Sequence, residues 1–369
     1  MIKLPSGVEI NSLIEDLRIF SWEAADVLLY YSKILKDPKH KTDILKNDNN
    51  EDPVTIADLE VNNLIIKRIN EKYKEINWEI LSEENVKIES ENYNPSADWL
   101  WVLDPLDGTK DFIQGTSNYA LHLALNYKNK PFIGIVLIPE KDQLWISNVE
   151  NVWCEKRDGS LIKLNPPHNK NLKEMVLVTS KNHRNPTLKN LIQKIDFKEV
   201  IIMGSIGCKV TSIIRGESDI YICLSLPGKS SPKDWDFAAP AAILKSAGGA
   251  ITNLDNQELT YGKSNFEQGG IIVASNNILM HQSICLEIKE IIKPRSVSGN
   301  KGTFGHTLII GGCKEMPGAV TIAALSAYKA GCGLVTICVP KAISRIVKSK
   351  VPEAIVIEMD VSDDGCYFN

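Results

Sequence analysis

The sequence lacks any run of about twenty apolar residues, and the residues after Met1 lack the apolar stretch of a signal peptide. We therefore expect neither a membrane-spanning helix nor a membrane partner, and we expect a cytoplasmic protein. Positive charge is not in excess either, since 42 Lys and Arg residues stand against 46 Asp and Glu residues and the formal net charge is -4. Nucleic acid is consequently a poor candidate partner.

Histidine is also scarce, with six residues, and the eight cysteines sit singly rather than in the closely spaced pairs of a zinc site. A zinc or iron site built on imidazole or thiolate is therefore not expected. We interpret the cysteines as reduced thiols. Any metal ion should be bound by oxygen atoms.

The apolar residues predict an α+β architecture. Helical spacing appears over residues 12–36 and 56–73, and a polar segment at 39–51 without periodicity separates them. Short β-type runs then predict a largely antiparallel sheet, and beyond Met175 strands and helices alternate as far as a helix near residues 235–247. The length of 369 residues allows a second unit.

The densest cluster of functional residue types follows the apolar run at residues 99–103. Asp104 and Asp107 are three apart, and on a turn at a strand end both carboxylates can face one point. The proline between them fixes the backbone so that the carbonyl oxygen of Leu106 can face the same point. The alternative is an ordinary surface turn, because Asp, Pro and Gly are common turn residues.

Gly108 and Thr109 follow directly. Glycine allows close approach of the backbone, and a helix that begins at Thr109 would present free N–H groups to a phosphate. This short stretch can therefore bind both magnesium and a phosphoryl group.

Two further acidic motifs stand at element ends. Glu83 follows an apolar strand and can complete the metal site, although a Glu pair is also typical of a solvated surface. Asp236 lies in the first turn of a helix, where an acid can simply offset the helix dipole. Asp234 can fill that role and leave Asp236 for metal.

A third motif lies just before the second helix. Asp58 can be an ordinary first-turn acid of that helix. Asp52, which is followed by a proline, can instead accept a proton from Thr109, so that the Thr109 hydroxyl orients a water molecule.

Together these segments resemble the inositol monophosphatase family, over roughly residues 10–292. The resemblance implies a five-layered α/β/α/β/α sandwich and two or three Mg²⁺ ions. It implies that Glu83, Asp104 and the Leu106 carbonyl bind the first ion, and that Asp104, Asp107 and Asp236 bind the second. Asp52 and Thr109 would activate the attacking water, and the N–H groups of Gly108 and Thr109 would hold the phosphate.

Within that family the Thr-Lys-Asp-Phe sequence at 109–112 resembles the 3'(2'),5'-bisphosphate nucleotidase branch of sulfur assimilation. This implies a small phosphorylated substrate, adenosine 3',5'-bisphosphate, and substrate contacts from Gly204, Ser205 and Lys209. The alternatives are an inositol-1-monophosphatase, a fructose-1,6-bisphosphatase or a non-catalytic scaffold. The resemblance implies a monomer or a homodimer.

A boundary is expected near Pro294, which gives a phosphatase domain at 1–293 and a second module at 294–369. The glycine-rich segments at 301–306, 311–312 and 330–336 resemble the first part of the NAD(P)H-hydrate dehydratase family, which has a ribokinase-like fold. We interpret this module as a truncated, partial α/β unit with no catalytic residue of its own.

Overall fold

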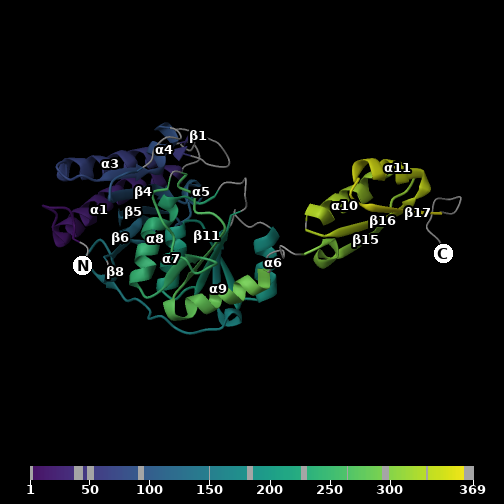
Figure 1. Ribbon diagram of the computed structural model, residues 1–369. Coiled ribbons are helices and arrows are strands. Elements are labelled where there is room, and N and C mark those ends of the chain that lie inside the picture. Colours follow the sequence, from purple (N-terminus) through teal and green to yellow (C-terminus); the bar gives the residue numbers. More distant parts are fainter. Residues whose placement is uncertain are drawn as a thin grey trace. The chain divides into compact units, whose positions relative to one another are not determined.

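The computed structural model describes residues 3–36, 45–47, 54–89, 95–148, 150–180, 186–225, 231–263, 265–292, 299–329 and 331–360. The chain divides into two compact units, Met1–Ile292 and Lys293–Asn369 (Figure 1). A short antiparallel pair, β1 (Leu45–Asn47) with β2 (Val54–Thr55), precedes the second helix of the first unit.

The larger sheet of the first unit has seven strands in the order β3-β4-β5-β6-β7-β8-β9. All neighbours are antiparallel except β3 and β4, which are parallel. The expected antiparallel sheet is thus correct except at this edge. The strands are β3 (Glu79–Ser82), β4 (Trp99–Asp107), β5 (Ala120–Tyr127), β6 (Lys130–Ile138), β7 (Gln143–Ser147), β8 (Val152–Glu155) and β9 (Leu161–Ile162).

The smaller sheet has five strands in the order β11-β10-β12-β14-β13. β10 runs parallel to both of its neighbours, whereas β14 is antiparallel to β12 and β13. The strands are β10 (Val176–Ser180), β11 (Glu199–Met203), β12 (Ile220–Leu224), β13 (Ala250–Asn253) and β14 (Ile271–Ser275).

Helices cover both faces of both sheets. One apolar core lies between the larger sheet and the helices α1 and α3, a second lies between the two sheets around α7 and α8, and a third lies between the smaller sheet and α6 and α9 (Figure 1). This is the expected five-layered α/β/α/β/α sandwich. The helices are α1 (Ile10–Leu35), α3 (Ile56–Lys72), α6 (Pro186–Ile195), α7 (Ile206–Ile214), α8 (Asp234–Ser246) and α9 (Ile278–Ile292).

The burial pattern of each helix matches its layer. α1 buries a stripe at helical spacing that includes Leu13, Leu17, Ala24 and Leu28, because only one side of it meets a sheet. α7 is buried at every position from Ile206 to Ile214, because it lies between two sheets. None of the helices formed by the described residues is long and apolar enough to cross a lipid bilayer.

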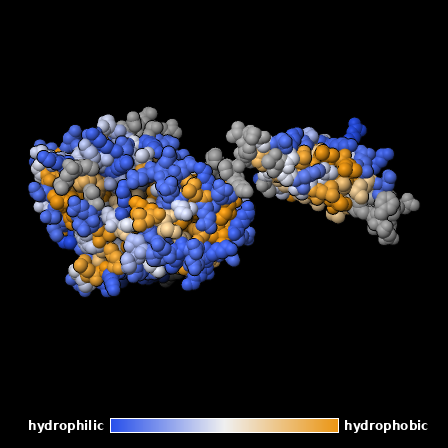
Figure 2. All heavy atoms as spheres, turned by 60° about the horizontal axis from the view of Figure 1, so that its bottom comes forward, coloured by the Kyte–Doolittle hydropathy of each residue, from blue (hydrophilic) through white to orange (hydrophobic). Residues whose placement is uncertain are grey.

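The second unit is a three-stranded parallel sheet in the order β15-β16-β17. Helices α10 and α11 pack on one face of it. The other face exposes apolar side chains of both outer strands, and apolar atoms gather on this unit in Figure 2. The sequence predicted only its first strand, helix and second strand. The elements are β15 (His306–Ile310), α10 (Gly318–Lys329), β16 (Leu334–Pro340), α11 (Lys341–Lys350) and β17 (Ile355–Met359).

A buried imidazole links α9 to the smaller sheet. His281 lies 2.7 Å from the hydroxyl of Ser275 through Nδ1 and 2.8 Å from that of Thr252 through Nε2. Burial lowers the pKa of His281 to about 4, from an ordinary value of 6.5. The imidazole is therefore neutral in the folded chain at neutral pH.

This shift predicts a pH dependence of stability. Between pH 6.5 and about 4 the unfolded chain binds a proton at His281 that the folded chain does not bind, so the free energy of unfolding falls as the pH is lowered through this window. The expected loss reaches up to about 3 kcal/mol. All seven tryptophans lie in the first unit, so urea unfolding followed by tryptophan fluorescence measures this unit. The His281→Gln variant should lose less stability over the same window, and an equally steep loss would contradict the assignment.

Candidate active site

An irregularity in β4 brings Asp104 and Asp107 to one side of the larger sheet. Asp104 pairs with His122 on β5, but Asp107 pairs with Ala120, so β4 carries one extra residue between the two pairs. Residues three apart in a regular strand face opposite sides, and an extra residue reverses that alternation. The strand thus continues through the Asp-Pro-Leu-Asp sequence, and the expectation of a turn after residue 103 was wrong.

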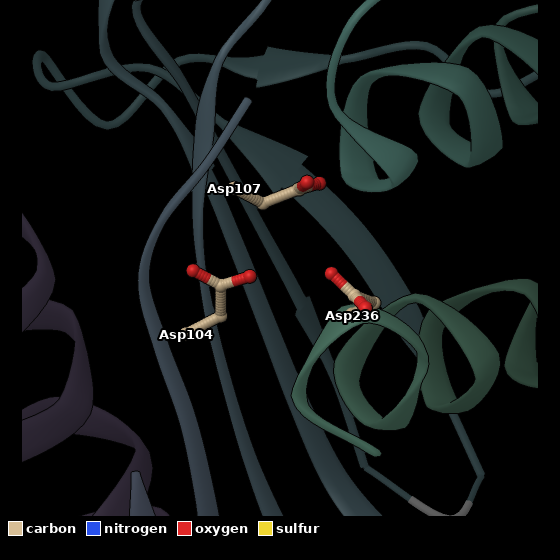
Figure 3. Close-up of side chains that lie close together, drawn as sticks. All are labelled: Asp104, Asp107 and Asp236. Atoms are coloured by element: carbon tan, nitrogen blue, oxygen red, sulfur yellow. The ribbon is translucent and has the colours of Figure 1, made fainter. Parts of the chain in front are cut away.

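Asp236 completes a cluster of three carboxylates. One oxygen atom from each of Asp104, Asp107 and Asp236 lies within 4.8 Å of the other two. Figure 3 shows the three side chains directed toward a common space, two from β4 and one from the first turn of α8. The sequence prediction that distant acidic motifs meet is confirmed for these residues.

Glu83 borders the same cluster. It is the first residue of α4 (Glu83–Glu89), which follows β3, the parallel neighbour of β4. Its carboxyl group is close enough to that of Asp104 for the negative charge of Glu83 to raise the pKa of Asp104. Lys87 Nζ lies 2.9 Å from the Glu83 carboxylate and offsets part of its charge.

Burial and mutual repulsion dominate the electrostatics of this cluster. Burial raises the pKa of Asp104 well above its ordinary value, and the neighbouring Glu83, Asp107 and Asp236 raise it further. The pKa of Asp236 is raised by burial and by Asp107 and Glu83. Converging carboxyl oxygens from one buried residue, Asp104, and two half-buried residues, Asp107 and Asp236, are the kind of ligand set that hard divalent cations such as Mg²⁺ prefer. The residues present therefore fit a divalent cation.

The start of α7 binds one carboxylate oxygen of Asp107, the Oδ2 atom. Asp107 Oδ2 accepts hydrogen bonds from the Ser205 hydroxyl at 2.6 Å, from the Ile206 N–H at 2.5 Å and from the Gly207 N–H at 3.3 Å. A helix N-terminus favours a negatively charged partner, so these three donors fix the Asp107 carboxyl group at the start of α7. Ser205 was expected to contact the substrate; in the structure its hydroxyl binds Asp107, and the substrate contact stays a prediction.

His122 also approaches Asp107, with 3.2 Å between its Nε2 and Asp107 Oδ2. The ring is fully buried on β5, and its Nδ1 lies 3.3 Å from the Trp235 carbonyl oxygen. His122 thus lies between the two acidic motifs. A polar residue within an apolar strand is the one signal of this role that can be seen in the sequence.

Lys209 was another expected substrate contact. Its side chain is buried, its Nζ donates to the Gly204 carbonyl, and the Nζ lies 5.3 Å from the centre of the Tyr221 ring. Burial lowers the pKa of Lys209. The ammonium group thus has partners inside the protein, and direct contacts of Lys209 and Gly204 with substrate stay predictions.

The Thr109 hydroxyl has two acceptors among the described residues, the Leu106 carbonyl and Asp58. The Thr109 hydroxyl lies 3.0 Å from the Leu106 carbonyl oxygen and 3.4 Å from Asp58 Oδ1. Thr109 begins the short helix α5 (Thr109–Ile113), as expected. Asp52, which was predicted to pair with Thr109, lies outside the described residues.

Asp58 is fixed by the start of α3. Its Oδ2 accepts the Thr55 N–H at 2.8 Å and the Thr55 hydroxyl at 2.5 Å. The Asp58 N–H donates back to the Thr55 hydroxyl oxygen at 3.4 Å, which completes a capping box. Burial, with a contribution from Glu84, raises the pKa of Asp58 to about 8. The sequence analysis treated Asp58 only as a first-turn acid; the Thr55 to Asp58 spacing was the available signal that its carboxyl group turns back toward the helix start.

Gly108 connects β4 to α5 in a left-handed conformation with φ of +89°. A Cβ atom there would lie 2.9 Å from the Asn118 carbonyl oxygen and 3.1 Å from the Ser205 amide nitrogen. Both the backbone angle and the close approach require glycine. Gly108 thereby lets β4, α5 and the start of α7 meet.

The sequence analysis expected Asp234 to stabilise the start of α8 and to leave Asp236 for metal. This assignment of roles was wrong. Asp236 Oδ2 accepts the Lys233 N–H at 2.5 Å, so Asp236 itself caps the start of α8. Asp234 instead accepts hydrogen bonds from the Gly262 N–H and from Gln268 Nε2. Capping and cluster formation are compatible because the two oxygens of one carboxylate face different partners.

Comparisons with known proteins agree with this geometry. Residues 16–293 match the model of the inositol monophosphatase family, and residues 307–366 match that of NAD(P)H-hydrate dehydratase. The 3'(2'),5'-bisphosphate nucleotidase CysQ of Buchnera aphidicola is 33% identical over 59% of this chain and 77% of its own length. CysQ of Aggregatibacter actinomycetemcomitans is 29% identical over 59% of this chain and 78% of its own length.

Solved structures show the same fold. Inositol monophosphatase II from Staphylococcus aureus is 24% identical, with a TM-score of 0.58 over 77% of this chain and 99% of that chain. The crystal structure of 2'AMP-bound SaIMPase-II is 23% identical, with a TM-score of 0.58 over 76% of this chain and 95% of that chain.

Replacing Asp104 by Asn should separate metal binding from stability. In the presence of EDTA, Asp104→Asn should raise the free energy of unfolding by about 1 to 2 kcal/mol, because one buried like charge is removed. Its magnesium affinity, measured by titration calorimetry, should fall at least about tenfold. The exposed Asp98→Asn variant is the control and should change neither quantity. A less stable Asp104→Asn that binds magnesium normally would contradict the cluster as a metal site.

Proposed function

The chain belongs to the inositol monophosphatase family and is a phosphomonoesterase of that family, and on this premise we propose that it removes the 3'-phosphate of adenosine 3',5'-bisphosphate with two or three Mg²⁺ ions. The proposal of metal-dependent hydrolysis rests on the three carboxylates from β4 and α8 that lie close together. The substrate is supported by the relatives that are named as 3'(2'),5'-bisphosphate nucleotidases.

Glu83, Asp104, Asp107, Asp236 and the Leu106 carbonyl would hold the cations. Bound there, the cations would offset the charge of the carboxylates and of the phosphate and would make water a stronger nucleophile. The protein holds these ligands in position. The start of α7 binds Asp107 Oδ2, and the Lys233 N–H binds Asp236 Oδ2. An oxygen of each remains available to the common space.

Asp58 and Thr109 would orient the attacking water. Asp58 accepts a hydrogen bond from the Thr109 hydroxyl. The lone pairs of the Thr109 oxygen then remain free to accept a hydrogen bond from the water. The Thr109 hydroxyl has two acceptors, Asp58 and the Leu106 carbonyl. By rotating about its C–O bond it can donate to either of them. The sequence analysis gave this part to Asp52, which lies outside the described residues, and that assignment stays a prediction beside Asp58.

The phosphate would be held by the N–H groups of Gly108, which is the N-cap residue of α5, and of Thr109, which is the first residue of that helix. Gly204 and Ser205, at the start of α7, would border the rest of the substrate. Lys209 would act by balancing the charge of the nearby carboxylates from within the protein. We propose that the second unit, which matches the model of NAD(P)H-hydrate dehydratase, takes no part in hydrolysis.

Phosphate release in the presence of magnesium tests the substrate. Adenosine 3',5'-bisphosphate should be hydrolysed at least about tenfold more efficiently, as kcat/KM, than inositol 1-phosphate or fructose 1,6-bisphosphate. A preference for inositol 1-phosphate would identify an inositol monophosphatase instead, an alternative that the solved structures of such enzymes support. Hydrolysis of none of the three would favour a non-catalytic protein.

The same assay tests the second unit. A variant of the chain that ends at Pro294 retains every element of the first unit and should keep the same substrate preference and rate. A large loss of activity with the first unit still folded would show that the second unit participates in catalysis or assembly.

Thr109→Val tests the orientation of water. The variant keeps the shape of the side chain but loses the hydroxyl, so kcat should fall by about 100-fold or more while magnesium affinity changes little. Thr109→Ser retains the hydroxyl and should keep most of the activity. Equal activity of the Val and Ser variants would exclude a role for the hydroxyl.

A further inference from the structure

A cavity of about 190 Å³ lies in the first unit on the far part of α8. Lys245 on its rim is nine residues beyond Asp236, which is about 13 Å along a helix axis. The cavity shares no lining residue with the carboxylate cluster.

The walls of this cavity are mixed, and apolar surface exceeds polar surface only slightly. Small side chains on α8, Ala241 and Ala242, leave the space open, while Pro131, Ile251 and Leu259 present larger apolar surfaces. A compact apolar group would remove this surface from water.

The charges of the cavity all come from three residues. Lys130 and Lys245 contribute two ammonium groups, and Glu258 contributes one carboxylate. Lys245 Nζ lies 2.5 Å from Glu258 Oε1, and Lys130 Nζ lies 3.3 Å from Glu258 Oε2. The lining therefore keeps one positive charge in excess, and each ammonium group has further N–H donors to offer.

The segment that carries Glu258 is tied to the body of the unit. The Tyr261 N–H donates to the Asn129 carbonyl at 3.1 Å, and Asn129 Nδ2 donates to the Tyr261 carbonyl at 2.5 Å. Asn253 and Gln257 close the other end of the segment by a backbone hydrogen bond of 3.0 Å. The cavity is thus formed before a ligand enters, which lowers the entropic cost of binding.

We propose that this cavity binds a small organic monoanion that has a compact apolar or aromatic body and one carboxylate. The apolar body would contact Ala241, Ala242 and Ile251, and the carboxylate would accept hydrogen bonds from Lys130 and Lys245 beside Glu258. A phosphate dianion suits the cavity less well, because Glu258 already neutralises one of the two ammonium groups.

Benzoate is the probe, and neutral benzamide, of nearly the same shape, is its matched control. Ligand-detected NMR titration of the full chain should give benzoate a dissociation constant on the order of 1 mM and benzamide one at least about tenfold weaker. Equal affinities, or no benzoate binding at concentrations on the order of 10 mM, would overturn the proposal.

Variants locate the probe. Ala241→Phe fills the cavity and should abolish benzoate binding, while Lys245→Gln, an exposed and therefore well-tolerated change, should reduce it about tenfold. Lys128→Gln is the matched control, since Lys128 is an exposed lysine outside the lining, and benzoate affinity should not change. Benzoate binding that survives both Ala241→Phe and Lys245→Gln would place the probe elsewhere and refute the site.

Discussion

The first unit is organised around the repulsion between carboxylates that share a buried space. Two unit charges 4.8 Å apart cost about 3 kcal/mol at the effective dielectric constant of a protein. The fold opposes this cost locally, through the Lys87 ammonium beside Glu83, the start of α7 beside Asp107 and the Lys233 N–H beside Asp236. A divalent cation would relieve what remains, so the same repulsion that weakens the metal-free protein provides affinity for metal.

The layered sandwich explains how such a cluster can be assembled. α7 and α8 lie between the two sheets and are buried nearly throughout, so their positions are fixed from both sides. The start of each helix reaches the end of β4, where α7 binds Asp107 and α8 supplies Asp236. The same burial that stabilises the middle layer thereby sets the spacing of the carboxylates.

The two units differ in how completely their sheets are covered. Both sheets of the first unit have helices on both faces, whereas α10 and α11 cover only one face of the parallel sheet in the second unit. Leu308, Ile310, Ile355 and Ile357 remain about half exposed on the other face. Parallel sheets are normally covered on both faces, so this exposed apolar face sets the second unit apart from the first.

Much of the site could be predicted from local patterns. The apolar run before Asp104, the glycine at 108 and the acids at helix starts are all visible in the sequence, and the scarcity of histidine points to oxygen ligands. The pairing of Thr109 with Asp58, the binding of Asp107 by α7 and the approach of His122 were missed. These contacts join segments that lie about 15 to 100 residues apart, and no local periodicity encodes them.

The sequence by itself determined which atoms are available: carboxyl oxygens at the ends of apolar strands and helices, a hydroxyl at Thr109, and a glycine where a side chain would not fit. Only the tertiary structure decided where each oxygen points, because one extra residue in β4 and the placement of α7 and α8 between two sheets set those directions. Side-chain direction depends on register and packing across the whole unit, which short-range residue patterns do not specify.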